Sequence, residues 1–481
     1  MASRRLLLLI LLLLFPLCAT ASPPPFVKHW QTSYNRPVPG FGDAEDWALS
    51  VLQTSDGGYL AAGFTEIECP AKNALERSPH LIKVDPHGRL LWQTAVDFGR
   101  PCDYGQFQEV IETADAYVAV GIKKVTPAPG LSPNRIGFAK VKKSTGEVLV
   151  QRILHLTTNF QSVDEQSTAR GIREVPGGGF VVVGSGKVNA APADAFFLRL
   201  DAAGNVLDLE TYDLAGEDDE IFAIDALQEN GAFAGYILGG SSEVSGGRDA
   251  VLRRVDPTGA EQWSVQIASE PSGAGFLQWR HWAQGTPGGW LGLSFPGVGA
   301  FPTTLPCDFQ EDSGRDRILS VQQTEKGEIL AGALLNEIQA SSNASSCGAG
   351  SPFEHEYRAG EGGLLRVSLD GILELAVNPA VCAGLDFNVL ARGSRGPGEE
   401  GYVFSCTVAS PGALEPGHVT EAVVVTTDLD GLETGRRQFI GDGAGACIFD
   451  MEVANDGGFV FAGSNTAHAD DSVLAKLYSP C

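Results

Sequence analysis

The sequence repeats one short phrase about eight times along its length. The phrase is a polar turn, an aromatic residue, a short apolar run and a glycine, and it reads SDGGYLAAG at residues 55–63 and NDGGFVFAG at residues 455–463. Glycine supplies the positive φ angle that a tight turn between two strands needs, so each copy predicts a β-hairpin. A long chain that repeats one hairpin indicates a fold of small sheets stacked on one another. The aromatic position is occupied in turn by Tyr59, Tyr117, Phe180, Tyr236, Trp290, Ile329, Tyr402 and Phe459.

A second hairpin follows most copies of the first. In residues 81–92, one apolar strand leads into the turn DPHG at 85–88, and a second strand follows that ends at Trp92. Two successive hairpins make a four-stranded antiparallel sheet, which is the blade of a β-propeller. The sequence therefore predicts an all-β fold with a single β-propeller domain.

The number of blades depends on one irregular stretch. The first hairpin is recognisable eight times and the second only seven times, because residues 276–312 lack the second turn. We predict eight four-stranded blades with the fifth degenerate, and the alternative is seven blades with an inserted hairpin. The predicted blades span about residues 45–100, 103–157, 164–214, 218–269, 274–312, 315–380, 384–441 and 445–481.

The last predicted blade has only three strands of its own. Its third strand is residues 473–477, and the chain ends soon afterwards at Cys481. Residues 29–34 (HWQTSY) resemble residues 91–94 (LWQT), which lie in a fourth strand. We therefore expect the segment 26–36 to complete the C-terminal blade and close the ring, because this pairing would remove a free sheet edge.

The first 21 residues are typical of a secretory signal peptide. Arg4 and Arg5 precede an apolar stretch at 6–17, and a small-residue site ends at Ala21. We expect cleavage near Ala21, a mature domain at 22–481, and a secreted or periplasmic monomer without a transmembrane segment. The formal net charge of −25 makes nucleic acid a poor partner.

The cysteine count favours disulfide bonds. Without Cys18 of the signal segment, eight cysteines remain, and an even number in an exported chain is typical of paired thiols. Most of them fall in long connections that strand alternation places on one face of the propeller. We predict the pairs Cys69–Cys102 and Cys347–Cys382, because each joins two loops of one blade. Asn343 is a glycosylation acceptor if the source is eukaryotic.

Acidic residues begin the innermost strand of most predicted blades. In a ring they would converge near the mouth of the central channel, where carboxylate oxygens could hold Ca²⁺. The alternative is that each side chain accepts backbone N–H groups within its own turn. These residues are Asp46, Asp103, Asp164, Asp219, Asp316 and Asp386.

The degenerate fifth blade carries a second candidate site. Trp279, Arg280, His281 and Trp282 follow one another there, and aromatic rings beside Arg and His could stack on a sugar or a peptide. The alternative is that these large side chains fill the space left by an incomplete blade.

The repeat as a whole resembles a known group of proteins. The Asp-Gly-Gly-aromatic hairpin at 56–59, followed by Lys-x-Asp-x-x-Gly-x-x-x-Trp at 83–92, resembles repeats of secreted, mostly bacterial, propeller proteins of unassigned function. Residues 256–263 are also similar to the repeat of quinoprotein (PQQ-type) propellers. The adjacent cysteines of those dehydrogenases do not occur in this sequence. The resemblance therefore implies a shared architecture and gives no support to a redox cofactor.

The sequence indicates the fold of this protein more clearly than its function. We expect an exported binding or scaffold protein that presents a loop-rich, disulfide-stapled face to an extracellular glycan or protein ligand. One alternative is a carbohydrate-active hydrolase or lyase that uses carboxylates at the channel mouth, although no catalytic residue can be assigned. The other alternative is a purely structural surface protein.

Overall fold

The structure is a computed structural model of the chain. It describes residues 27–36, 38, 44–125, 133–156, 166–187, 192–213, 216–244, 247–269, 276–283, 286–287, 291–294, 310–341, 356–377, 383–385, 390–392, 401–409, 420–439, 446–465 and 471–478. The regular elements in these residues are all β-strands, and no helix among them is long and apolar enough to cross a membrane.

The first three blades are regular four-stranded antiparallel sheets. Blade 1 contains β2 (Asp46–Gln53), β3 (Tyr59–Cys69), β4 (Ala74–Val84) and β5 (Leu90–Ala95). Blade 2 contains β6 (Gly105–Glu112), β7 (Ala116–Lys124), β8 (Asn134–Lys142) and β9 (Val148–Leu154). Blade 3 contains β10 (Gln166–Glu174), β11 (Phe180–Lys187), β12 (Asp194–Leu200) and β13 (Val206–Tyr212).

The next two blades share one hydrogen-bonded sheet of twelve strands. Blade 4 contains β14 (Asp219–Glu229), β15 (Ala232–Val244), β16 (Gly247–Val255) and β17 (Glu261–Ser269), followed by β18 (Phe276–Ala283), β19 (Thr286–Pro287) and β20 (Leu291–Ser294). Blade 5 contains β21 (Gln310–Gln323), β22 (Ile329–Ser341), β23 (Glu356–Val367) and β24 (Leu373–Val377), followed by β25 (Ala383–Leu385). A single parallel bridge, Arg248 with Arg315, joins the two antiparallel units.

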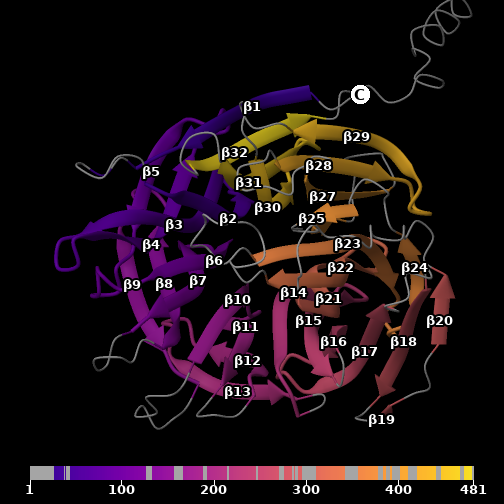
Figure 1. Cartoon of the computed structure of the whole chain (residues 1–481). Helices are drawn as coiled ribbons and strands as arrows, with labels where there is room; N and C mark the ends of the chain where they lie inside the picture. The colour runs from indigo at the N-terminus through magenta and orange to yellow at the C-terminus, as the bar shows by residue number, and fades with distance from the viewer. Residues whose placement is uncertain are drawn as a thin grey trace, which may run out of the picture.

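The last two blades complete the ring. Blade 6 contains β26 (Leu390–Arg392), β27 (Tyr402–Ala409), β28 (Thr420–Thr427) and β29 (Glu433–Phe439). Blade 7 contains β30 (Ala446–Val453), β31 (Phe459–Asn465) and β32 (Asp471–Tyr478), together with β1 (Val27–Tyr34). Figure 1 shows the sheets arranged around a central axis. The inner strands follow one another around that axis, and each contacts the next in the order β2, β6, β10, β14, β21, β26, β30 and β2 again.

The irregular stretch after residue 275 does not form a separate blade. Strand β18 pairs antiparallel with the outer strand β17, and β20 pairs with β18. The described strands make seven four-stranded units, which is the arrangement of the alternative with an inserted hairpin, and the predicted eighth blade at 274–312 lies partly outside the described residues. The physical reason is that a lone hairpin leaves sheet edges unpaired, whereas adding it to β17 satisfies one of them.

The N-terminal strand lies in the same sheet as the C-terminal strands. Strand β1 pairs antiparallel with β32, with Trp30 opposite Lys476 and Thr32 opposite Leu474. The same strand also contacts blade 1, because the Tyr34 hydroxyl donates a hydrogen bond to the Gly88 carbonyl at 2.5 Å. The two ends of the described chain are thus held in one sheet.

The repeated phrase is explained by local geometry. Gly57 has a φ of 82°, as the turn requires. The Asp56 carboxylate accepts hydrogen bonds from the Gly58 N–H and from the Lys83 ammonium, both at 3.0 Å. The Lys83 side chain is only 1% exposed. Asp456 and Lys476 repeat this ion pair in blade 7.

The glycine that ends the phrase sits against a bulge in the inner strand. A Cβ atom on Gly63 would lie 1.8 Å from the Trp47 carbonyl oxygen, a distance that no side chain tolerates. Gly121, Gly184 and Gly240 make the same close approach in blades 2 to 4. The bulge shifts the register of six inner strands by one residue. The bulged residues are Leu49, Gln108, Arg170, Phe222, Leu319 and Phe449.

The hydrophobic core lies between neighbouring blades. Tyr117 of blade 2 packs with Leu60 and Trp92 of blade 1 in one cluster of apolar side chains. The Trp30 ring lies 5.7 Å from the Tyr59 ring, and the Trp92 ring lies 6.2 Å from the Tyr117 ring. The aromatic residues Tyr59 and Tyr117 of the phrase are therefore contacts between blades.

Candidate functional site

The bulged residues surround a pocket in the central channel. This channel pocket has a volume of about 180 Å³, and all six bulge residues line it together with neighbours such as Glu109, Arg173 and Asp450. A bulge re-aims one side chain of its strand, so the repeated bulge gives the channel a ring of inward side chains. The ring combines leucines, phenylalanines, a glutamine and an arginine, which is a mixed apolar and polar lining.

Carboxylates of the inner strands tie neighbouring blades together in the channel. Glu109 of blade 2 accepts the Ile172 N–H of blade 3 at 2.6 Å, and Asp450 of blade 7 accepts the Val51 N–H of blade 1 at 2.8 Å. Asp225 of blade 4 accepts the Gln323 N–H of blade 5 at 2.9 Å. These acids therefore satisfy buried backbone donors, which is a structural role.

Arg173 forms ion pairs with two of these carboxylates, Glu109 and Asp225. Its guanidinium lies 2.5 Å from Glu109 and 3.6 Å from Asp225. Burial raises the pKa of Glu109, and the Arg173 charge opposes that rise. Burial also lowers the pKa of Arg173, but the charges of Glu109 and Asp225 outweigh it and raise the pKa above its ordinary value. Glu109, Arg173 and Asp225 therefore form a network of paired charges whose hydrogen bonds connect neighbouring blades.

Two aromatic rings of the pocket are held by neighbours. Phe449 stacks on Trp47 of blade 1, with ring centroids 5.2 Å apart and planes 19° apart. Phe222 lies beneath two guanidinium groups, those of Arg170 at 5.6 Å and Arg317 at 5.9 Å. Sequence inspection missed these residues because a bulge changes which side chain faces the axis, and no residue type marks its position.

Three of the acidic residues predicted at the channel mouth are buried in the described structure, and their place at the mouth stays a prediction. Asp46, Asp219 and Asp316 are between 0% and 2% exposed, and none of them lines the channel pocket. Asp103 lies in the loop before β6 and pairs with Arg100 at 3.3 Å. Asp164 and Asp386 lie outside the described residues. Within the described ranges, no three His, Cys, Asp or Glu side chains lie close enough to hold a metal ion.

The aromatic stretch predicted as a ligand site is at the outer rim of blade 4. Strand β18 lies beyond β17, so β15, β16 and β17 separate it from the inner strand β14. The Arg280 Nε donates to Gln266 Oε1 at 2.7 Å, which fixes β18 to its neighbour. The side chains of Trp279, His281 and Trp282 lie outside the described part of the structure, so their role as a ligand site stays a prediction.

Blade 1 carries a disulfide on the face of the long connections. Cys69, at the end of β3, is bonded to Cys102, in the connection between β5 and β6, with an S–S distance of 2.07 Å. This is the first of the two predicted pairs. Cys347, Cys382 and Asn343 lie outside the described residues.

The same face carries a compact group of aromatic and charged side chains near the disulfide. Arg77 pairs with Glu45 at 2.5 Å, and its guanidinium lies 4.2 Å from the centroid of the Phe64 ring and 6.0 Å from that of Tyr104. Lys123 is buried and donates to the Arg100 and Asp103 carbonyl oxygens at 2.9 and 2.5 Å. Burial lowers the pKa of Lys123 to about 8. These contacts hold the loop at 97–104 against blade 1.

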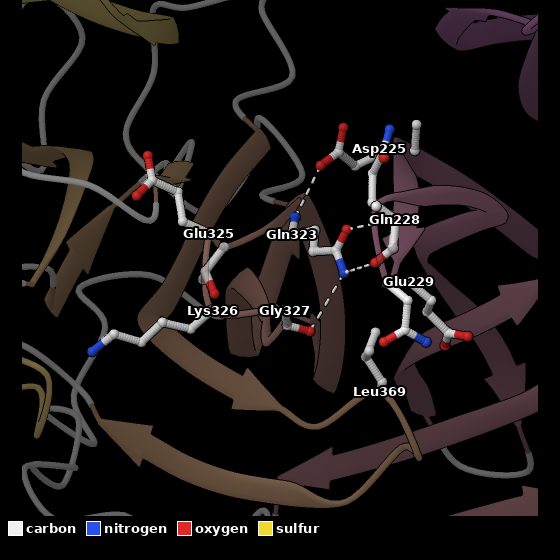
Figure 2. A pocket seen from close by; sticks show the side chains of 12 residues that line it. Asp225, Gln228, Glu229, Gln323, Glu325, Lys326, Gly327 and Leu369 are labelled. Atoms are coloured by element: carbon white, nitrogen blue, oxygen red, sulfur yellow. Dashed lines mark hydrogen bonds between the residues drawn. The ribbon is translucent and has the colours of Figure 1, made fainter.

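The opposite face carries the tight turns and a larger hollow. This blade 4/5 hollow has a volume of about 670 Å³ and lies between residues 225–231 of blade 4 and residues 323–327 of blade 5, with Leu369 at its edge. Figure 2 shows Gln323 between its two walls.

A comparison with solved structures finds several chains that are similar to this one over most of its length. BamB from Moraxella catarrhalis has a similar structure, with a TM-score of 0.44 and 10% identity over 94% of this chain and 99% of that one. The quinohemoprotein alcohol dehydrogenase from Comamonas testosteroni has a TM-score of 0.44 and 9% identity, over 95% and 77% of the two chains. The Pan2 WD40 domain from Neurospora crassa has a TM-score of 0.43 and 11% identity, over 96% and 97%.

With identities of 9–11% and TM-scores below 0.5, these likenesses assign no role to this chain. No protein-family model matches the sequence, and no curated protein matches it. The chain is an all-β protein of the β-propeller class, as its antiparallel four-stranded sheets around one axis define it.

Proposed function

We propose that this chain is an exported binding protein that presents its loop-rich, disulfide-stapled face to an extracellular glycan or protein ligand. The observation that carries the proposal is the disulfide between Cys69 and Cys102, which ties two loops of blade 1 together on that face. A loop that is rigid before binding loses less conformational entropy when the ligand arrives. Functional residues commonly lie on such loops above a rigid scaffold.

The side chains beside the disulfide offer suitable contacts. Tyr104 is partly exposed, and its hydroxyl donates to Gln106 Oε1 at 2.7 Å. The Lys124 ammonium lies 5.1 Å from the Tyr104 ring. An aromatic ring with amide and ammonium groups around it suits the apolar face and the hydroxyl groups of a sugar, or a polar peptide segment.

The test is a binding screen of the chain from residue 22, with disulfides intact. The probes are an array of neutral and acidic oligosaccharides and a phage-displayed peptide library, and calorimetry measures the affinity of each hit. We expect Tyr104→Ala to weaken the binding of a hit at least tenfold. Leu207→Ala, at an exposed position of the outer strand β13, serves as the matched control and should change the affinity less than twofold.

The outcome also separates the two ligand classes. Hits on the array alone identify a glycan, and hits in the library alone identify a protein partner. The proposal fails if neither probe yields a hit, or if Tyr104→Ala and Leu207→Ala have the same small effect on every hit.

A further inference from the structure

The ring closes at the interface between blade 7 and blade 1, and the two ends of this interface differ in character. In its middle, Leu474 of β32 packs with Ala48 of β2 in one cluster of apolar side chains. Two residues nearer the loop-rich face, the same strands carry Ser472 and Asp46. Residues two apart in a strand share a face, so Ser472 and Asp46 face the same interface as Leu474 and Ala48. The loop-rich end of the closing interface is therefore polar.

Several oxygen atoms at this end are buried without a hydrogen-bond partner. Asp46 and Ser472 are both 0% exposed, and within the described residues neither the Asp46 Oδ1 nor the Ser472 Oγ has such a partner. The Asn35 Oδ1, in the segment that follows β1, is a third buried atom of this kind. Buried polar atoms of proteins are nearly always paired, so a group of unpaired oxygens marks the place of a bound water or ion.

Three segments of the chain bring these oxygens together. The last residue of β1 lies opposite Ser472 of β32, so the next residue, Asn35, continues opposite Asp471. The Arg36 N–H donates a hydrogen bond to the Asp46 Oδ2 at 3.0 Å, which holds the same segment against the inner strand of blade 1. Four residues with side-chain oxygens thus meet at one place, and we call them the seam cluster: Asn35, Asp46, Asp471 and Ser472.

The seam cluster places two carboxylates in a buried environment. Asp471 is 7% exposed. Burial raises the pKa of Asp46 to about 6, and the charge of Asp471 contributes to this rise while that of Arg36 opposes it. Water molecules satisfy hydroxyl and amide oxygens, but they do not neutralise a buried carboxylate. A bound cation does both, because it accepts electron pairs from all these oxygens and attracts the two negative charges.

Blade 4 has a protein cation at the corresponding place. Asp219 begins the inner strand of blade 4 as Asp46 does in blade 1, and Arg253 lines the same small cavity as Asp219. The pairing of the second and third strands puts Ile82 of blade 1 at the position of Arg253. Blade 1 therefore has an apolar side chain where blade 4 has a guanidinium, and a cation from solution would supply the missing charge.

We propose that the seam cluster binds one calcium ion, which holds β1 and β32 of blade 7 against the inner strand of blade 1. Its side-chain donors are two carboxylates, one amide oxygen and one hydroxyl. Ca²⁺ takes about six to eight oxygen ligands of these kinds, so main-chain oxygens or waters complete the shell. This site differs from the ring of acids predicted from the sequence, because its two carboxylates, those of Asp46 and Asp471, lie at a single interface.

Calcium is favoured over magnesium by the origin of the donors. Mg²⁺ demands a nearly ideal octahedron at short distances, whereas Ca²⁺ accepts irregular shells. Side chains from three separate segments rarely meet the stricter demand. The site also joins the two ends of the described chain, so its role is to close the ring, and it does not depend on a ligand of the loop-rich face.

The test is a calorimetric titration of Ca²⁺ into the chain from residue 22, after treatment with EDTA and removal of the chelator. We expect saturable binding with one site per chain, and at least tenfold weaker binding of Mg²⁺. Asp46→Asn and Asp471→Asn keep the size of the side chain, and each should weaken Ca²⁺ binding at least tenfold. The matched control is Asp219→Asn, which changes the corresponding buried acid of blade 4 and should alter the affinity less than twofold.

A second measurement locates the ion in the unaltered chain. Hydrogen exchange should slow at 34–36 and at 471–473 when Ca²⁺ is added, and the midpoint of thermal unfolding should rise with the Ca²⁺ concentration. This result decides the case for any variant that near-ultraviolet circular dichroism shows to be unfolded. The proposal is overturned if Ca²⁺ does not bind, if Asp46→Asn and Asp219→Asn weaken its binding equally, or if exchange slows only elsewhere.

Discussion

The Trp263 indole N–H donates a hydrogen bond to the Leu369 carbonyl at 2.9 Å. Trp263 lies in the outer strand of blade 4, and Leu369 lies in the second turn of blade 5. Trp30 and Trp92 make the same bond to Pro86 and Lys143 of the blade that follows each of them. Blade 5 is thus the direct neighbour of blade 4, with no blade between them.

This relationship predicts that the inserted hairpin is dispensable for the ring. A variant in which a short Gly-Ser linker replaces residues 274–309 should unfold in one cooperative transition, because the seven described four-stranded units and the Trp263 bond remain. Denaturant unfolding followed by tryptophan fluorescence measures this. If an eighth blade were present, its removal would open the ring, and the variant would show early loss of structure or aggregation.

Removal of the indole donor should have a small and local cost. Trp263→Phe keeps the ring packed and loses one hydrogen bond, so we expect the free energy of unfolding to fall by about 1 kcal/mol. Arg254 still donates to the Leu369 carbonyl, which keeps that oxygen satisfied. Urea unfolding measures the change, and a loss above about 3 kcal/mol would contradict a role limited to this bond.

The ion pair in the repeated phrase should contribute modestly to stability. Asp56 is 57% exposed while Lys83 is buried, so solvent screens much of the attraction. We expect Asp56→Asn to lower the free energy of unfolding by about 1 kcal/mol, because the Lys83 ammonium keeps the Val84 carbonyl as a partner. Asp430→Asn, on an exposed turn without an ion pair among the described residues, is the control and should be neutral in the same urea titration.

Asp46 should make stability depend on pH. Burial, together with the charge of Asp471, raises the pKa of Asp46 to about 6, while hydrogen bonds from Thr65 and the Arg36 N–H oppose the rise. A folded-state pKa above the unfolded value of 3.8 means that the folded protein binds the proton more tightly. This contribution is therefore fully present below about pH 4 and is lost as pH rises through about 6, with a magnitude of roughly 3 kcal/mol.

His80 works in the opposite direction over part of this range. Burial lowers the pKa of His80 to about 3, so its contribution is present above pH 6.5 and is lost as pH falls toward 3. The measurement is therefore the difference in the free energy of unfolding between the unaltered chain and Asp46→Asn at several pH values. We expect Asp46→Asn to gain relative stability between pH 4 and pH 7. A difference that does not change with pH would refute the raised pKa.

The disulfide should stabilise the protein by restricting the unfolded chain. Cys69 and Cys102 are 33 residues apart, and closing a loop of that length contributes about 4 kcal/mol in the chain-entropy model. We expect the double variant Cys69→Ser with Cys102→Ser to lose about this amount in urea, and reduction of the unaltered chain to have a similar effect. Equal stability with and without the bond would show that Lys123 and Arg77 alone hold these loops.

The blade unit could be predicted because its signals are local. Each signal acts within one hairpin or on the neighbouring strand or blade. Gly57 provides the positive φ of the turn, Tyr59 packs against the neighbouring blade, and Gly63 allows the close approach of the inner strand. The Cys69–Cys102 pair could also be predicted, since two loops of one blade must lie near each other. The sequence left two blade counts open because the hairpin after residue 275 is as apolar as a blade hairpin. Whether it joins β17 or starts a new sheet depends on which edge is free.

The candidate sites were harder to predict from the sequence for a similar reason. The position of Asp46 and its equivalents at the start of the innermost strands predicts them near the channel mouth. The pocket in the channel is lined by the bulged residues, and a bulge re-aims its side chain without a mark in the sequence. The residues that line the channel pocket, such as Gln108 and Arg170, have no type in common. The seam cluster joins residues from both ends of the described chain, and no local pattern shows that these segments meet.

The repeated phrase by itself determined the fold class and the four-stranded unit. It did so because turns, hairpins and close contacts depend on residues near one another in the chain. Only the tertiary structure decided that seven units close the ring, that bulged residues line the channel, and that Trp263 meets Leu369. Those outcomes depend on contacts between segments 52 to 399 residues apart. The energies of these contacts are set by which sheet edges and side chains meet in space.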